Sequence, residues 1–184
     1  RAEVLQAMVR WGLPPGRVEV RHPHRGFSLT GAAYRLGVPL TVHPGIGYDI
    51  VYTHPMANGA AAGRAALLDF HGFAHSVGRI DGGVLLSVGS AVMAPQVFEK
   101  AVSVANNLRR QEGLEPLCMR IFVNDLAEAT WDWSAGEPPQ DQAAYYLRFC
   151  KSYSRMGGEM TYVAGDNRVL LPNLLHALRR AQPA

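Results

Sequence analysis

The sequence of 184 residues has little charge, only two cysteines and no long apolar run, and each shortage excludes a class of protein. At 18%, charged residues are too few for a disordered tail or an array of solvated helices. No stretch approaches the ~20 apolar residues of a membrane helix, so we expect no membrane partner. Cys118 and Cys150 form no Cys-x-x-Cys pair, and we expect both to be buried free thiols in the reducing cytoplasm.

The net charge of +3 is mild, and the basic residues form no dense patch. The most basic stretch, residues 17–25, has no interleaved aromatic residues, so we interpret it as a solvated loop and expect no nucleic-acid partner. The length suits one domain with a sizeable core. We therefore expect a single α/β domain over residues 1–184. Because the chain opens at Arg1 without a methionine, we also expect that it lacks an N-terminal portion.

Apolar patterning, punctuated by the 19 glycines and 12 prolines, predicts strands that alternate with helices. The expected strands are residues 18–20, 38–42, 83–88, 119–123 and 160–163. The expected helices are residues 2–10, 27–36, 57–77, 96–110 (with Pro95 at the first helical position), 142–156 and 171–181. Such alternation predicts a mostly parallel sheet with helices on both faces. The strand at 83–88 is continuously apolar, which is typical of a strand covered on both faces.

Ligands of open α/β sheets bind at the carboxyl ends of the strands, and three such ends carry glycine or polar residues. One is the loop from His43 through Gly45 and Gly47 to Asp49. The other two are the turn at Gly89-Ser90 and the pair Asn124-Asp125. If the sheet is parallel, the three loops share one edge, where glycines let a ligand approach the backbone. We therefore predict a binding site at this edge, although each loop alone is better explained as a tight turn.

No standard motif accompanies these loops. The Gly45-Ile46-Gly47 run lacks the third glycine of a dinucleotide-binding fingerprint and is not followed at once by a helix. Ser90 lacks both outer glycines of the Gly-x-Ser-x-Gly nucleophile turn, so we interpret it as a ligand donor or a turn residue. Both lysines, Lys100 and Lys151, fall on expected helices and are interpreted as solvated side chains.

Histidines provide two candidate metal sites. His71 and His75 are four residues apart, but the glutamate of His-Glu-x-x-His is absent, and we interpret them as helix histidines rather than ligands. His43, Asp49 and His54 could each supply a metal ligand, although their spacing is irregular.

The segment from Val38 through Gly45-Ile46-Gly47-Tyr48-Asp49 to His54 resembles a segment of deoxyhypusine synthase. That family segment has a proline-containing strand, an Asp-Gly-Ser loop, a Gly-Asp pair and an apolar run ending in histidine. The aspartate of the family's first loop is replaced here around His43-Pro44. Residues 67–74 and then 82–90 resemble the helix and the glycine-rich strand end that follow in the family. The resemblance covers about residues 38–108 and is closer to bacterial proteins called deoxyhypusine synthase-like.

The resemblance implies a Rossmann-like fold that binds NAD and assembles into a homo-oligomer with sites near subunit interfaces. Asp49 matches the carboxylate that holds the polyamine substrate, and Gly89-Ser90 matches part of the turn that contacts the cofactor. The family's catalytic-lysine loop has no counterpart, and Ala94-Pro95 stands where its histidines are expected. The candidate catalytic residues are Asp49 and His54. The candidate cofactor-binding residues are His43, Gly45, Gly47, Gly89, Ser90, Asn124 and Asp125.

Three hypotheses follow from the sequence. The first is an NAD-binding, deoxyhypusine synthase-like protein that acts on a small substrate, which can carry an amine. The second is a non-catalytic ligand-binding or assembly protein of the same fold. The third is a metal-dependent enzyme that uses His43, Asp49 and His54.

Overall fold

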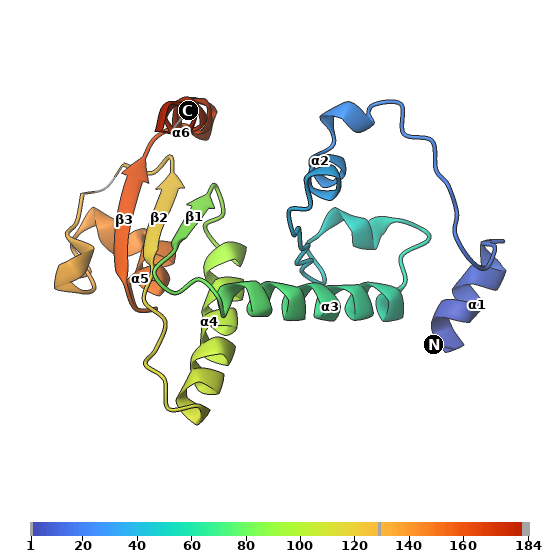
Figure 1. Ribbon diagram of the computed structural model, residues 1–184, viewed down its shortest axis with the longest axis horizontal. Helices are drawn as coiled ribbons and strands as arrows, with labels where there is room; N and C mark the ends of the chain where they lie inside the picture. Colours follow the sequence, from blue (N-terminus) through green and yellow to red (C-terminus); the bar gives the residue numbers. More distant parts are fainter. Residues whose placement is uncertain (1, 129, 182–184) are drawn as a thin grey trace. The chain divides into compact units, whose positions relative to one another are not determined.

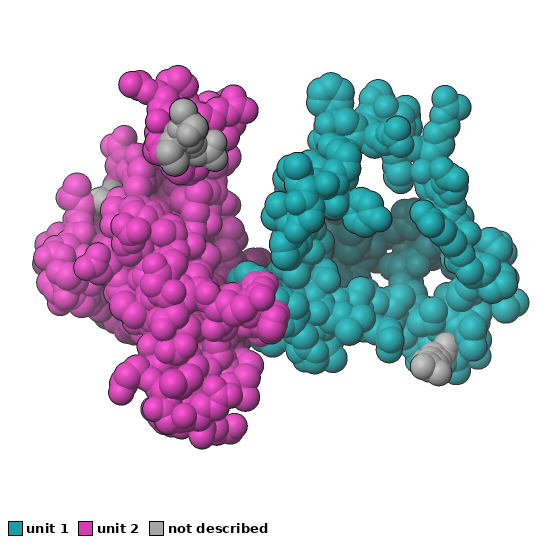
Figure 2. All heavy atoms as spheres, viewed as in Figure 1, with its two compact units in different colours: residues 1–73 teal, residues 74–184 magenta. Residues whose placement is uncertain are grey.

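The computed structural model describes residues 2–128 and 130–181. The chain divides into two compact units, an N-terminal unit of residues 1–73 and a C-terminal unit of residues 74–184 (Figure 2). The expectation that all 184 residues form a single domain stays a prediction, and the two units are described separately. None of the helices among the described residues is long and apolar enough to cross a membrane.

The N-terminal unit is built from helices joined by irregular chain (Figure 1). The α2 helix begins where the Ser28 hydroxyl accepts a hydrogen bond from the Gly31 amide at 3.1 Å, and it ends at Gly37, whose φ of 66° is left-handed. The helices predicted at residues 2–10, 27–36 and 57–77 are confirmed, and the last two begin two residues later than expected. The elements are α1 (Ala2–Arg10), η1 (Arg25–Phe27), α2 (Leu29–Leu36), η2 (Ile50–Thr53) and α3 (Gly59–Val77), which continues past the unit boundary.

The two strands predicted in this unit, residues 18–20 and 38–42, are wrong, since both segments are irregular. The amide of Val38 donates to the Ala33 carbonyl at the end of α2, and the Val42 amide donates to the Asp69 carboxylate at 2.8 Å. These two amides are thus bonded to α2 and α3, and among the residues that the structure describes no neighbouring strand pairs with either segment. A β-branched, apolar sequence forms a strand only where such a partner exists.

The C-terminal unit contains an all-parallel sheet in the order β1-β2-β3 (Figure 1). Its strands are β1 (Val84–Val88), β2 (Arg120–Asp125) and β3 (Glu159–Ala164), and flanking helices include α4 (Met93–Gln111), α5 (Arg148–Ser154) and α6 (Asn167–Ala181). The strands are in register at their amino ends, with Val84 beside Arg120 and Arg120 beside Glu159. The predicted Rossmann-like α/β fold with a parallel sheet is therefore confirmed.

The core of this unit lies between the sheet and the helices α4 and α5. The Phe98 ring of α4 and the Tyr153 ring of α5 lie 6.0 Å apart, and both side chains are buried. The Tyr153 hydroxyl donates to the buried Ser87 hydroxyl of β1 at 3.0 Å. Buried polar groups cost free energy unless they are paired, so this bond fixes α5 against the sheet. The other buried residues of these elements are Ala101, Val102, Ala105, Ile121, Val123, Asn124, Phe149 and Cys150, with Pro95 at the start of α4.

Several details of the C-terminal unit differ from the sequence predictions, among them the start of α6 at Asn167 rather than at residue 171. The helix expected at 142–156 is split into η4 (Ala143–Tyr146) and α5. The α4 helix begins at Met93, so Pro95 takes its third position rather than its first. Val84 and Leu86 of β1 are 49% and 40% exposed, so the expected cover on both faces of this strand is wrong at these two side chains. A continuous apolar run does not by itself distinguish an edge strand from a central one.

The close approach of Gly158 to Met119, the residue before β2, provides a test of the packing beside the sheet. Gly158 has φ +88°, and a Cβ there would overlap the carbonyl oxygen of Met119. We expect Gly158→Ala to lower the free energy of unfolding by roughly 3 kcal/mol, from about 1–2 kcal/mol of left-handed strain and about 1–3 kcal/mol of overpacking. The measurement is urea denaturation of the full chain.

The matched control is Gly113→Ala, because Gly113 also has a positive φ, +73°, but a Cβ added there would meet no other atom within 4 Å. The control should lose only the strain component. Equal losses in the two variants would contradict the close packing of Gly158 against Met119.

Candidate functional site

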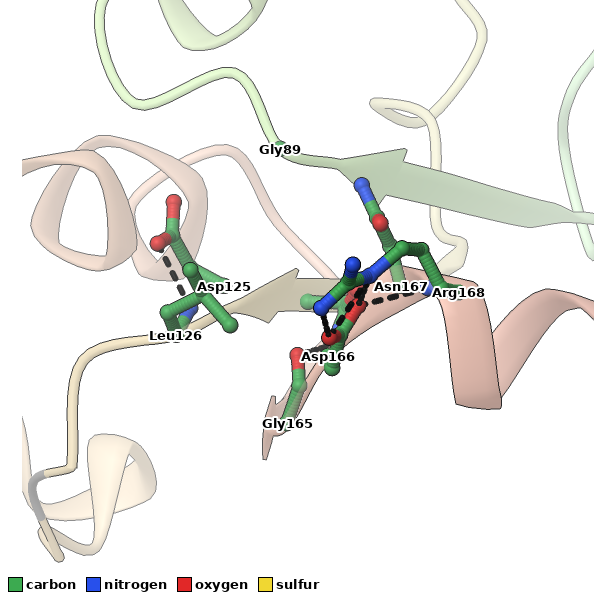
Figure 3. A pocket seen from close by; sticks show the side chains of 8 residues that line it. Gly89, Asp125, Leu126, Gly165, Asp166, Asn167 and Arg168 are labelled. Carbon is green, nitrogen blue, oxygen red and sulfur yellow. Dashed lines mark hydrogen bonds and ion pairs between the residues drawn. The ribbon is translucent and has the colours of Figure 1, made fainter.

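A pocket of about 350 Å³ lies at the carboxyl ends of the three parallel strands (Figure 3). Gly89 follows β1, and Asn124 and Asp125 end β2. Gly165 and Asp166 connect β3 to α6, whose first residues are Asn167 and Arg168. Three of the residues predicted from the strand ends, Gly89, Asn124 and Asp125, thus line one cavity. This is the edge at which open α/β sheets bind ligands.

Backbone hydrogen bonds join the strand ends that form this pocket. The Gly89 amide donates to the Asn124 carbonyl at 3.1 Å, and the Gly165 amide donates to the Asp125 carbonyl at 2.9 Å. Gly89 has φ +65°, a conformation that glycine adopts without steric cost and that turns the chain after β1. Because both glycine amides are engaged within the protein, neither is free to hold an anion.

Asn124 is the most buried polar residue of the pocket, with 2% of its surface exposed. Its side-chain amide donates to the carbonyls of Val163 and Gly165, both at 2.9 Å. Its carboxamide oxygen is buried and has no hydrogen-bond partner among the described residues. A buried acceptor left unpaired costs about 1–3 kcal/mol of free energy.

On the α6 side of the pocket, Arg168 is paired with Asp166 (Figure 3). The Arg168 Nε atom lies 3.1 and 2.9 Å from the two carboxylate oxygens. The hydrogen bond from the Arg168 side chain holds the pKa of Asp166 below its usual range. Asp166 also occupies the first amides of the helix, since its carboxylate accepts from the Arg168 amide at 2.8 Å and its carbonyl accepts from Val169 and Leu170. The start of α6 is thus capped by the protein itself.

Asp125 lies on the other side of the pocket (Figure 3). Its carboxylate is not paired with Arg168, which bonds to Asp166 instead. Its Oδ1 accepts from the Leu126 amide at 2.6 Å. Its second oxygen has no partner among the described residues. Burial, with a smaller contribution from the Asp125 carboxylate, raises the pKa of Cys150 and of Tyr162 to about 12. The groups that surround Asp125 therefore stay neutral near pH 7.

Ser90 was predicted beside Gly89 but does not line the pocket. Its hydroxyl oxygen accepts a hydrogen bond from the Ala94 amide at 3.0 Å, which satisfies one of the first amides of α4. The structure thus gives Ser90 a local role in starting that helix. A contact between Ser90 and a cofactor stays a prediction.

The predicted loop from His43 to Asp49 lies in the N-terminal unit and follows irregular chain rather than a strand. The Asp49 carboxylate accepts from the amide of the buried Gly45, and this bond closes the turn that contains Gly47. The His43 Nε2 atom lies 3.0 Å from the Thr41 hydroxyl, and burial lowers the pKa of His43.

The His54 Nδ1 atom accepts from the Met56 amide at 3.1 Å. Neither His54 nor the residues of the 43–49 loop belong to the lining of the pocket described above, and their predicted roles stay predictions. Within residues 2–128 and 130–181, no three His, Cys, Asp or Glu side chains are grouped so that they could hold a metal ion. His43, Asp49 and His54 therefore do not form the ligand set that the metal hypothesis requires.

The residues that connect β3 to α6 were missed from the sequence. The strand expected at 160–163 has a carboxyl end like the others, and the Gly165-Asp166-Asn167 run follows it directly. The last helix was expected to begin only at residue 171, so the short turn between this strand and the helix was not recognised in the sequence. Applying the strand-end rule to this last strand would have found Gly165 to Arg168.

Comparison with known proteins finds no matching family, no matching curated protein and no matching solved structure. The class of the protein therefore rests on its own geometry. The C-terminal unit is a Rossmann-like α/β unit with a polar pocket at the carboxyl edge of its sheet.

The two cysteines provide a test of the environment beside Asp125. Cys118 is exposed, which corrects the expectation that both thiols are buried, whereas Cys150 is fully buried. With its pKa raised to about 12, the Cys150 thiol stays protonated at about pH 8 and is unreactive. We expect a disulfide reagent such as Ellman's reagent to modify only Cys118 in the native protein, as measured by absorbance.

In the Cys118→Ser variant we expect no modification until guanidinium unfolds the chain, after which Cys150 reacts. Rapid modification of native Cys118→Ser protein would show that Cys150 is accessible and would contradict the packing of α5 on the sheet.

Proposed function

We propose that this protein binds a nucleotide of the NAD type in the pocket at the carboxyl edge of the C-terminal sheet. The observation that carries the proposal is that residues following all three parallel strands line one pocket, with glycines at two of the three strand ends. In folds of this class, such a pocket is the usual place for a nucleotide. Its volume, about 350 Å³, is near the lower end of the ~300–1,000 Å³ found for ligand pockets and suits one nucleoside portion of a dinucleotide.

We further propose that the ligand chemistry follows the deoxyhypusine synthase-like resemblance, with a small substrate that can carry an amine. In this proposal Asp49 holds the substrate and His54 assists the reaction. His43, Gly45, Gly47 and Ser90 are the remaining proposed cofactor contacts. The resemblance also leads us to propose a homo-oligomer, which light scattering on the full chain would measure.

A second candidate function is binding without turnover, and the positions of the lysines favour it over aminobutyl transfer. Lys100 lies 2.6 Å from Glu99 on α4, and Lys151 is paired with Glu137. Neither lysine lines the pocket. A transfer that proceeds through a lysine nucleophile therefore has no candidate residue there. The binding proposal holds for both an enzyme and a binding protein.

The test is calorimetric titration of the full chain with NAD. We expect saturable binding, weakened about tenfold by Asp125→Asn, because a charged acceptor contributes about 1.4 kcal/mol more than a neutral one to a hydrogen bond with a hydroxyl. The substitution keeps the shape of the side chain and an oxygen for the Leu126 amide.

The matched control is Glu159→Gln, which removes one negative charge at the opposite, amino end of β3. We expect this variant to bind NAD as the wild type does. No binding at millimolar NAD would overturn the proposal, and so would equal weakening by the two variants, since the effect would then be one of net charge alone.

A further inference from the structure

The strand β1 forms a free edge of the C-terminal sheet. It pairs with β2 on one side, and among the residues that the structure describes no strand pairs with its other side (Figure 1). The opposite edge strand, β3, is contacted by η3 (Trp133–Ala135), and the Tyr162 hydroxyl of β3 donates to the Ala127 carbonyl at 2.6 Å. Proteins usually block an exposed edge with a proline, a charged side chain, a bulge or a covering segment. By contrast, β1 keeps an unbroken register with β2 and contains neither a proline nor a charged residue.

The backbone of β1 presents a row of unpaired hydrogen-bonding groups at this edge. The Gly83 carbonyl and the Gly89 amide both bond to β2, at 3.0 and 3.1 Å. Successive residues of a strand direct their amides and carbonyls to opposite sides, so every second residue between these glycines faces β2. The amides and carbonyls of Val84, Leu86 and Val88 therefore point away from β2. None of these groups has a hydrogen-bond partner among the described residues.

The side chains of this edge are apolar and uncharged. Residues 82–98 contain no Asp, Glu, Lys or Arg, although charged residues make up 18% of the chain. Val84 and Leu86 are 49% and 40% exposed. Because an edge strand that faces water usually carries charge, this composition indicates an edge that is covered. It also disfavours a strongly charged partner, which would find no opposite charge within residues 82–98.

We infer that β1 pairs with β1 of a second copy of this chain, antiparallel and about a two-fold axis at Leu86. In this register Leu86 lies opposite Leu86 of the second copy, and Val84 lies opposite Val88 of the second copy. The outward amides and carbonyls then form three hydrogen-bonded pairs, and the side chains form apolar cross-strand pairs. The three-stranded sheets of the two copies join into one continuous sheet.

A second copy fits this edge better than an unrelated peptide does, because the strand is complementary to itself. All three outward residues are apolar, so the two-fold rotation places apolar residues opposite one another along the whole strand. The same residues are used on both copies, so the pairing closes at two chains. The inference goes beyond the proposed function, since it assigns a surface to the proposed homo-oligomer and does not depend on NAD.

The first test is the mass of the full chain in solution, measured by size-exclusion chromatography with light scattering. We expect twice the 20.0 kDa of one chain. Leu86→Lys places two like charges opposite each other at the two-fold axis, so this variant should have the mass of one chain. The matched control is Thr161→Lys, because Thr161 is exposed on β3 in the same row of the sheet as Leu86. The control should keep the mass of two chains.

Amide hydrogen exchange of the ¹⁵N-labelled full chain locates the pairing. The dimer protects the outward amides of Val84 and Val88, whereas the amides of Leu85 and Ser87 bond to β2 with or without a partner. We expect Val84 and Val88 to exchange about tenfold more slowly in the wild type than in Leu86→Lys, with little change at Leu85 and Ser87. In the wild type all four amides should be protected, a comparison that stands even if Leu86→Lys is unstable.

Three results would overturn the inference: a wild-type mass of one chain, a mass that Leu86→Lys leaves unchanged, or fast exchange of Val84 and Val88 in the wild type. Loss of the dimer in Thr161→Lys as well would also overturn it, because the effect would then be one of added charge alone. Calorimetric titration of the wild type with NAD separates the two proposals. If NAD binds to a single chain, the proposed function stands and the inference fails. If the dimer depends on Leu86 but NAD does not bind, the inference stands and the NAD proposal fails.

Discussion

The carboxyl ends of the three strands are held together by hydrogen bonds that converge on the last two residues of β2. The Asn124 side chain reaches two carbonyls at the end of β3, and the backbone carbonyls of Asn124 and Asp125 accept the amides of Gly89 and Gly165. These bonds place the glycine turns after β1 and β3 on either side of the end of β2. They also engage the amides of Gly89 and Gly165 within the protein, so these two amides are not free to bind a ligand.

The charged residues around the pocket also influence which ligands it can hold. Arg168 and Asp166 form an ion pair, and Asp166 accepts the amides of Arg168, Val169 and Leu170 in the first turn of α6. Asp125 keeps one unpaired oxygen, and nearby Cys150 and Tyr162 stay neutral because their pKa values are raised. The Tyr153–Ser87 hydrogen bond fixes α5 on β1, two residues before the pocket residue Gly89.

The sequence predicted the parts of the site that depend on topology and missed the parts that depend on side-chain partners. Gly89, Asn124 and Asp125 were found because parallel strands end at one edge of a sheet. The strand predicted at residues 38–42 was wrong because the amides of Val38 and Val42 bond to α2 and to Asp69. Strand propensity does not include such contacts. The unpaired oxygen of Asn124 depends on the register of β2 against β3 and on the turn at Gly165, so no local pattern could have indicated it.

The carboxyl edge of the C-terminal sheet is the proposed ligand site, and a titration of the ¹⁵N-labelled full chain with NAD, followed through the backbone amide signals, tests it. We expect the largest shifts on Gly89, Asp125, Gly165 and Arg168, while Val84, Arg120 and Glu159 at the amino edge stay unmoved. Shifts concentrated at the amino edge, or none at the four pocket amides at saturating NAD, would contradict it.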